Sequence, residues 1–172
     1  MTKIVLVVPN EMMESDAIDF KQEFFNNSET AINGDFKWGG MSSYTDWLKM
    51  IKDSQFNETC NPKWGIISTF FAVRKSDNRV IGIANLRHTL TEKFINSGHI
   101  GYSVRPTERR KGYATEILKQ LIIYAKEQGM CSLELVCYDD NVGSIKTITS
   151  NGGTLLRMLD GKNVYSIRIH SK

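Results

Sequence analysis

Alternating and periodic apolar positions divide the first part of the chain into strands and helices. The apolar run 4–8 predicts a strand, and 12–27 carries apolar side chains near helical spacing. Segments 64–75 and 79–88 are rich in β-branched and aromatic residues and are joined by a short polar turn, which predicts a hairpin. Between them and the first helix, 44–53 can form a short helix with Thr45 near its start as a capping residue.

The second part of the chain continues the alternation of strands and helices. We expect a strand at 98–104, which ends before the restricted residue that precedes Pro106, and a helix at 114–129. A strand at 131–138, a shorter helix within 141–153 and a hairpin over 154–170 that turns at 160–163 complete the pattern. This order predicts an α/β fold without an internal repeat or a linker.

Composition narrows the class of protein. With 172 residues, 41% hydrophobic and 24% charged, the chain is expected to form a single packed domain over 1–172. A net charge of +3 is too mild to indicate a nucleic-acid partner. The run 4–8 is too short for a signal core or a membrane span, and three cysteines without C-x-x-C spacing suggest neither disulfides nor a metal site. We therefore expect a cytoplasmic protein with no metal and no membrane partner.

A basic stretch lies directly before the predicted helix 114–129. Arg105, Arg109, Arg110 and Lys111 place four positive charges there, and Gly112 and Ala114 keep side-chain bulk small. Helix N-termini carry unpaired N–H groups and partial positive charge, so they bind phosphates. The stretch predicts a diphosphate site, although a solvated basic loop would have a similar composition. Neither a nucleotide P-loop nor a G-x-G-x-x-G motif occurs.

Three residues in this stretch match a family hallmark: Arg or Gln, two residues, Gly, one residue, then Gly or Ala. Arg109, Gly112 and Ala114 satisfy it between a strand and a long helix. The chain from about 64 onward therefore resembles the GNAT superfamily of acyl-CoA-dependent N-acyltransferases. The string 99–118 looks much like the branch that acetylates ribosomal-protein N-termini, and Asn141 and Ser144 match a second cofactor segment.

The resemblance implies a mixed, mostly antiparallel central sheet flanked by helices, and acetyl-CoA as acyl donor. Backbone amides of 110–115 would hold the diphosphate, and the strand end 102–105 would bond the pantetheine. Asn141 and Ser144 would contact the pantetheine or the thiol, although Asn141 is also a good helix N-cap. The cofactor-binding residues so implied are Tyr102, Ser103, Val104, Arg105, Arg109, Arg110, Lys111, Gly112, Tyr113, Ala114, Thr115, Asn141 and Ser144.

Direct transfer to an amine needs a neutral nitrogen, so a base or a water chain must remove a proton. His99 is the first candidate and His88 the second, because imidazole titrates near neutral pH; either could instead be structural. The tyrosine that many members use to protonate the thiolate is replaced by Ile148. Ser144, Tyr138 or water could take that role.

Two further expectations follow for the site. Cys137 is expected to be a buried apolar residue and not a nucleophile. Three tryptophans and the loop 91–98 are expected near the acceptor pocket, yet the acceptor stays open among peptide N-termini, polyamines, aminoglycosides and amino acids. A homodimer is compatible with the resemblance. The alternative function is a non-catalytic acyl-CoA-binding sensor or interaction module.

Overall fold

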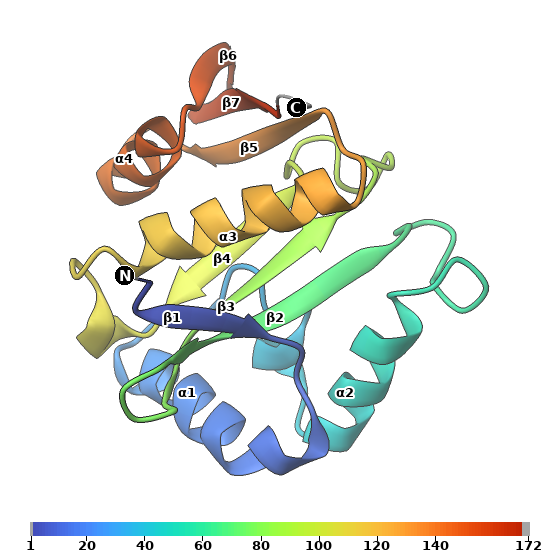
Figure 1. The fold of residues 1–172 in the computed structure, drawn as a ribbon, viewed down its shortest axis with the longest axis vertical. Helices are drawn as coiled ribbons and strands as arrows, with labels where there is room; N and C mark the ends of the chain where they lie inside the picture. The colour runs from blue at the N-terminus through green and yellow to red at the C-terminus, as the bar shows by residue number, and fades with distance from the viewer. Residues whose placement is uncertain (1, 170–172) are drawn as a thin grey trace.

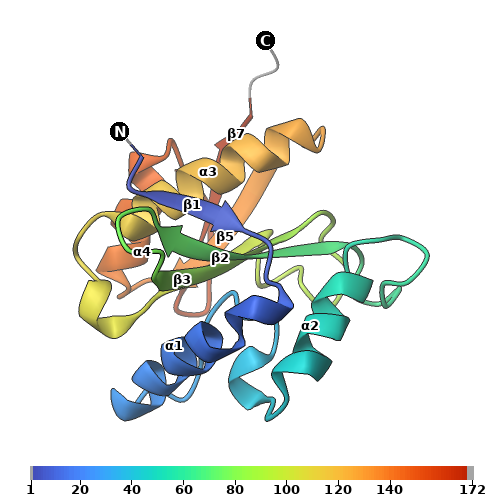
Figure 2. The ribbon, with the colours of Figure 1, turned by 60° about the horizontal axis from the view of Figure 1, so that its bottom comes forward.

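The computed structural model describes residues 2–169 (Figures 1 and 2). Short 3-10 turns occur at Glu11–Met13, Trp38–Gly40 and Pro106–Glu108. The helices and strands, in chain order, are β1 (Ile4–Val7), α1 (Glu14–Asn26), α2 (Tyr44–Asp53), β2 (Ile67–Arg74), β3 (Val80–Arg87), β4 (Ile100–Val104), α3 (Tyr113–Glu127), β5 (Ser132–Tyr138), α4 (Val142–Ser150), β6 (Thr154–Leu159) and β7 (Lys162–Arg168).

The strands form two sheets with antiparallel pairing throughout. The first sheet has the order β1-β2-β3-β4, and the second has the order β5-β7-β6. An isolated bridge between Gly98 and Leu135 links them. The predicted α/β class with mostly antiparallel strands and flanking helices is confirmed. The expected single sheet is instead divided into two sheets at the boundary between β4 and β5.

The first sheet is covered on both faces (Figures 1 and 2). Phe70 and Ala72 of β2 pack on the side of α3, whereas Phe71 and Val73 pack on the side of α1 and α2, with Trp47. Successive strand residues point to opposite faces, so a sheet with two covered faces needs apolar residues at every position. This burial explains why 67–73 reads as a nearly continuous apolar run.

Most predicted elements are present with shifted ends. Ser43, and not Thr45, caps α2, because its Oγ accepts a hydrogen bond from the N–H of Asp46 at 3.1 Å. The central hairpin is confirmed as β2 and β3. The terminal hairpin turns over two residues, with Gly161 at φ +72°, and the last residue expected in it, His170, lies outside the described residues. Within 2–169 no helix has the length and apolar character needed to cross a bilayer.

Candidate active site

The N-terminus of α3 is open to an anion. Gly112 precedes the helix at φ +85°, no side chain caps the helix, and a Cβ added at Gly112 would meet no atom within 4 Å. The first intrahelical bond runs from the N–H of Glu116 to the carbonyl of Gly112 at 3.2 Å. The N–H groups of Tyr113, Ala114 and Thr115 therefore have no helical acceptor and are available to a ligand.

The basic side chains before α3 are largely paired with carboxylates. Arg105 is 1% exposed, and its Nη1 lies 2.9 Å from both Asp19 and Glu23 on α1. Its guanidinium faces α1, so the prediction that its charge surrounds the helix entry is corrected. The structure thereby assigns that side chain to holding α1 against the turn that follows β4.

Two more cations in this stretch also have partners. Arg109 donates from Nε to the carbonyl of Val104 at 3.0 Å and from Nη2 to Glu29 at 2.8 Å, and Lys111 bonds the buried Glu108 at 2.9 Å. Arg110 is exposed, and no ion pair is present for it among the described residues. Anion binding here therefore depends on main-chain amides with Arg110 and Arg109 beside them.

A cavity of about 630 Å³, which we call the α3 cavity, lies at this helix N-terminus. It brings together most of the predicted cofactor residues, but Arg105 and Lys111 do not line it. Its lining residues are Glu29, Ala31, Asn33, Tyr102, Ser103, Val104, Glu108, Arg109, Arg110, Gly112, Tyr113, Ala114, Thr115, Asn141, Gly143, Ser144, Lys146 and Thr147.

One edge of β4 faces this cavity. The main-chain N–H of Arg105 donates to the carbonyl of Ile81, and the carbonyl of His99 accepts from the main-chain N–H of Arg87. Alternate residues of a strand direct their main-chain groups to the same side, so the odd-numbered residues 99–105 direct theirs toward β3. Tyr102 and Val104, at the alternate positions, direct their main-chain groups away from β3. Of the predicted segment 102–105, only these two residues can therefore hydrogen-bond an extended ligand through their backbone.

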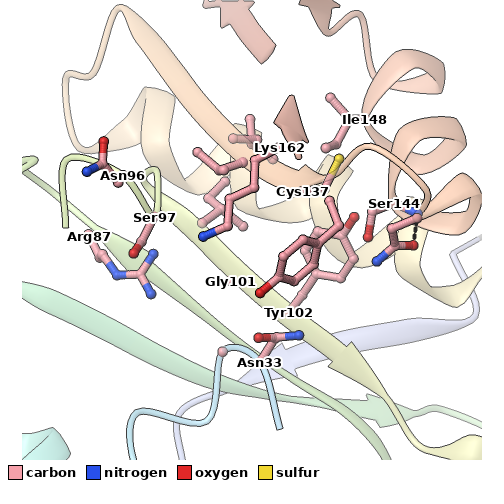
Figure 3. Close-up of a pocket in the computed structure, with 16 residues that line it drawn as sticks. Asn33, Arg87, Asn96, Ser97, Gly101, Tyr102, Cys137, Ser144, Ile148 and Lys162 are labelled. Atoms are coloured by element: carbon pink, nitrogen blue, oxygen red, sulfur yellow. Dashed lines mark hydrogen bonds between the residues drawn. The ribbon is translucent and has the colours of Figure 1, made fainter. Parts of the chain in front are cut away.

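A second cavity of about 250 Å³, which we call the β5 cavity, lies between β4 and β5 (Figure 3). It shares Asn33, Tyr102, Asn141 and Ser144 with the α3 cavity, so the two cavities join at these residues. Its lining residues are Asn33, Gly34, Arg87, Asn96, Ser97, Ile100, Gly101, Tyr102, Leu135, Val136, Cys137, Tyr138, Asn141, Ser144, Ile148 and Lys162.

Four polar residues meet at the junction. Asn141 accepts a hydrogen bond from the N–H of Ser144 at 3.0 Å, so it caps α4 in addition to lining both cavities. The hydroxyl of Tyr102 is buried beside Ser144 and Thr147 without a well-formed hydrogen bond. Burial raises the pKa of Tyr102, which these two hydroxyls partly offset. The junction therefore holds a phenol that stays protonated at neutral pH.

His99 is engaged in the contact between the two sheets. Its ring Nδ1 accepts a hydrogen bond from the main-chain N–H of Glu134 at 2.9 Å, and its main-chain N–H donates to the Glu134 carbonyl at 2.7 Å. Burial lowers the pKa of His99, which keeps the ring neutral. In this tautomer Nε2 carries the proton and Nδ1 is occupied, and His99 lines neither cavity. This geometry does not support the predicted role of His99 as general base.

His88 lies in a different polar network. Its Nε2 is 2.9 Å from Ser68 Oγ, which is 3.0 Å from the hydroxyl of Tyr124. Burial lowers the pKa of His88, and this side chain also lines neither cavity. The structure therefore does not bring the two candidate bases together in one cleft.

Three more residues named from the sequence, Ile148, Cys137 and Tyr138, line the β5 cavity, whereas the expectation for Trp38, Trp47 and Trp64 is wrong, because none of them lines either cavity. Ile148 is 1% exposed in the β5 cavity, and its side chain has no acidic group that could protonate a thiolate. Burial raises the pKa of Cys137, which holds its sulfur as a thiol and fits the expectation that it is not a nucleophile. Tyr138 is 61% exposed at the cavity rim, with the ammonium of Lys162 5.3 Å from its ring centre.

Sequence reasoning missed several residues of these cavities. Asn33 and Glu29 lie before the segment that carries the family resemblance, and no local motif marks them. Arg87 at the end of β3 and Lys162 at the start of β7 line the β5 cavity from different sheets, and no local motif marks that arrangement. A charged residue that ends an otherwise apolar strand is the one signal the sequence offered for Arg87.

A family model described as an acetyltransferase (GNAT) domain matches residues 10–154. This chain belongs to the GNAT acetyltransferase family. The sequence resemblance is thereby confirmed, and it extends further toward the N-terminus than the segment that suggested it. The chain is an N-acetyltransferase that uses acetyl-CoA as acyl donor. No curated protein sequence shows significant similarity to it.

Solved structures of acetyltransferases share the fold over nearly the whole chain. A microcin self-immunity acetyltransferase in complex with acetyl-CoA and AMP has a TM-score of 0.66 at 20% identity and covers 98% of this chain and 94% of its own. An acetyltransferase from Salmonella typhimurium with its cofactor acetyl-CoA has a TM-score of 0.66 at 16% identity, covering 99% and 96%. A ribosomal-protein α-N-acetyltransferase in complex with coenzyme A has a TM-score of 0.67 at 17% identity, covering 98% and 96%.

The position of His99 generates a prediction about stability. His99→Ala removes the acceptor of the half-buried Glu134 amide and should lower the free energy of unfolding at pH 7.5 by about 1–3 kcal/mol. His99→Asn offers a side-chain oxygen in place of Nδ1 and should cost less. Chemical denaturation of the parent and both variants measures the difference.

The pH dependence of stability separates the same two variants from the parent. Because the folded pKa of His99 lies below its ordinary 6.5, the unfolded chain binds more protons near pH 6. The stability of the parent should therefore fall as pH is lowered from about 7 to 5, and both variants should show a shallower fall. A parent whose stability is constant across that window would contradict a buried neutral His99.

Proposed function

We propose that this chain transfers the acetyl group of acetyl-CoA directly to a primary amine while both substrates are bound. The observation that carries the proposal is the junction of two cavities at Asn33, Tyr102, Asn141 and Ser144. The α3 cavity fits the donor and the β5 cavity fits the acceptor. Direct attack needs the amine and the thioester at one point, and the shared residues supply that point.

The α3 cavity suits each part of the donor. The diphosphate would accept hydrogen bonds from the free amides at 113–115, where Gly112 leaves the main chain accessible. The pantetheine would extend along the outward main-chain groups of Tyr102 and Val104, like a further strand beside β4. This path leads the thioester to the junction beside Asn141 and Ser144.

The amine must lose a proton without an obvious side-chain base. Among the described residues that line the β5 cavity there is neither a carboxylate nor an imidazole. Arg87 and Lys162 place positive charge there, which disfavours the ammonium form of a bound amine. We propose that water accepts the proton, and that His99 has a structural role in place of the catalytic one predicted.

Tyr102 supplies the proton that Ile148 cannot. As the amine nitrogen attacks the carbonyl carbon, the carbon–sulfur bond breaks and the thiolate takes a proton from the Tyr102 hydroxyl, which water then restores. The raised pKa of Tyr102 keeps that proton in place until the thiolate forms. A phenol at the junction also removes the main reason to consider a sensor that lacks catalysis.

Other expectations stay proposals. We propose one domain over 1–172 and a cytoplasmic location, which the free thiols of Cys60, Cys131 and Cys137 support. We also propose that the chain can form a homodimer.

Gly112→Asp tests the donor site. The variant places a carboxylate beside the diphosphate, and like-charge repulsion should weaken acetyl-CoA binding by roughly 30- to 100-fold, or about 2–3 kcal/mol. Gly129→Asp is the matched control, because Gly129 has φ +78°, also has open space for a Cβ, and ends the same helix away from both cavities. Calorimetry measures both affinities. Equal affinities for the two variants would move the diphosphate site elsewhere.

Tyr102→Phe tests the acid. The variant should lower kcat about 10- to 100-fold, near the lower limit for general acid catalysis because a thiolate leaves readily, with little change in acetyl-CoA affinity. Tyr124→Phe removes a half-buried hydroxyl outside both cavities and should keep kcat within a few-fold. If Tyr102→Phe kept full kcat, Tyr102 would not be the proton donor. If Tyr138→Phe instead showed the 10- to 100-fold loss of kcat, that role would pass to Tyr138.

A further inference from the structure

The β5 cavity contains positive charge without negative charge. Arg87 and Lys162 are the cations among its lining residues, and no aspartate or glutamate stands among them. Asn33, Asn96 and Ser97 add amide and hydroxyl groups that can donate hydrogen bonds. Figure 3 shows the guanidinium of Arg87 and the ammonium of Lys162 directed toward one another across this cavity.

Arg87 is held in place but is not neutralised. Its Nη1 donates to the Gly98 carbonyl at 2.7 Å, and its guanidinium lies 4.6 Å from the ring centre of Phe94. Its Nε is buried and has no partner among the described residues. Burial without a nearby carboxylate lowers the pKa of Arg87 to about 10. The fold therefore holds the Arg87 cation in place despite the desolvation cost of its burial, and its Nε–H donor makes no hydrogen bond among the described residues.

This situation is unusual for the arginines of this chain. Arg74, Arg79, Arg105, Arg109 and Arg157 each form an ion pair with a carboxylate. Arg110 and Arg168 have no ion pair among the described residues, but both are exposed to water. A partly buried guanidinium without a counter-ion is costly, and an anionic ligand would relieve that cost.

Lys162 supports the same interpretation from the second sheet. It begins β7 directly after the turn of the terminal hairpin, and its ammonium lies over the ring of Tyr138. Arg87 comes from the end of β3 in the first sheet. A ligand anion between the two cations would therefore contact both sheets, with its other end toward the junction at Tyr102.

Size and charge together narrow the acceptor. The cavity volume of about 250 Å³ is below the range of roughly 300–1,000 Å³ that drug-sized ligands occupy, which favours a small molecule. Polyamines and aminoglycosides carry several positive charges, and Arg87 and Lys162 would repel them. Among the acceptor classes left open by the sequence, amino acids and similar anionic amines fit best.

We propose that the acceptor is a small primary amine that carries a carboxylate or a phosphate, and that Arg87 and Lys162 bind this anion while the amine reaches the junction. The inference rests on the proposed function, because it assigns the β5 cavity to the acceptor. A planar guanidinium can form two hydrogen bonds with either anion, which gives orientation as well as attraction.

Two sets of amines, each matched in its number of carbon atoms, test the inference. The first set is 4-aminobutyrate, 4-aminobutanol and 1,4-diaminobutane; the second is O-phosphoethanolamine, ethanolamine and ethylenediamine. Release of the coenzyme A thiol gives kcat/KM for each. We expect the anionic member of at least one set to exceed its neutral and dicationic partners by about tenfold or more, as expected for a charge-assisted contact. The set with the larger ratio distinguishes carboxylate from phosphate.

Two variants connect that preference with the proposed residues. Arg87→Gln and Lys162→Gln remove the charges while keeping polar groups, and each should reduce the preference for the anionic amine at least several-fold, mainly through KM. Arg168→Gln is the control, because Arg168 is an exposed arginine without an ion pair outside both cavities. Acetyl-CoA affinity, measured by calorimetry, should be unchanged in all three variants.

A binding measurement covers the case in which no amine of the panel is turned over. With coenzyme A bound, 4-aminobutyrate or O-phosphoethanolamine should raise the melting temperature more than the matched neutral amine, and Arg87→Gln should abolish the difference. The inference would be overturned if the protein bound acetyl-CoA but neutral and anionic amines had equal kcat/KM, or raised the melting temperature equally. The proposed donor site would be unaffected by that result. Preferred turnover of a peptide N-terminus over every small amine would also overturn it. If the parent protein did not bind acetyl-CoA, the proposed function itself would be refuted.

Discussion

The contact between His99 and Glu134 fixes where the two sheets meet and where they part. The pair exchanges two hydrogen bonds, from the His99 N–H to the Glu134 carbonyl and from the Glu134 N–H to the His99 ring. Gly98 makes the close approach feasible, since a Cβ there would lie 2.7 Å from the Glu134 carbonyl oxygen. Beyond this point the strands separate, and the outward edge of β4 has no partner strand. Both cavities exist because the pairing stops.

The first helix and the residues that follow it lie against the candidate donor site from the other side. Glu23 accepts hydrogen bonds from Arg105 and from the N–H and hydroxyl of Thr107, and Glu29 bonds Arg109. These carboxylates neutralise the basic side chains that stand before α3 and fix the shape of the turn. Since Arg105, Arg109 and Lys111 are already paired, the free amides of α3, with Arg110 beside them, become the main positive feature that a diphosphate would meet. The Arg-x-x-Gly-x-Ala hallmark therefore serves as a shaped backbone more than as a charge cluster.

Local features of the fold were predictable from the sequence, and long-range partnerships were not. The spacing of Arg109, Gly112 and Ala114 depends only on the start of one helix, so the sequence alone was enough to locate the candidate donor site. The roles of His99 and Arg105 depend on Glu134, 35 residues away, and on Asp19, 86 residues away, which no periodicity reveals. The α2 cap was misplaced by two residues because Ser43 and Thr45 both carry suitable hydroxyls.

Charge in the β5 cavity illustrates the same limit. Arg87 ends an apolar strand and could equally have faced solvent; only the packing of residues 91–98 against it, with the carbonyl of Gly98 as acceptor, turns it inward. The sequence predicts Tyr102 as a cofactor contact through its main chain, yet its hydroxyl reaches α4 beside Ser144 and Thr147. Side-chain direction across the gap, and not residue type, decides these roles.

Amide hydrogen exchange with and without acetyl-CoA tests the central claim, that the donor occupies the gap between the sheets with its diphosphate on α3. The account predicts slower exchange at Tyr113, Ala114 and Thr115 and at the outward amides of Tyr102 and Val104, with α2 unchanged. Protection confined to other segments, with the α3 amides exchanging at their unliganded rate, would contradict it.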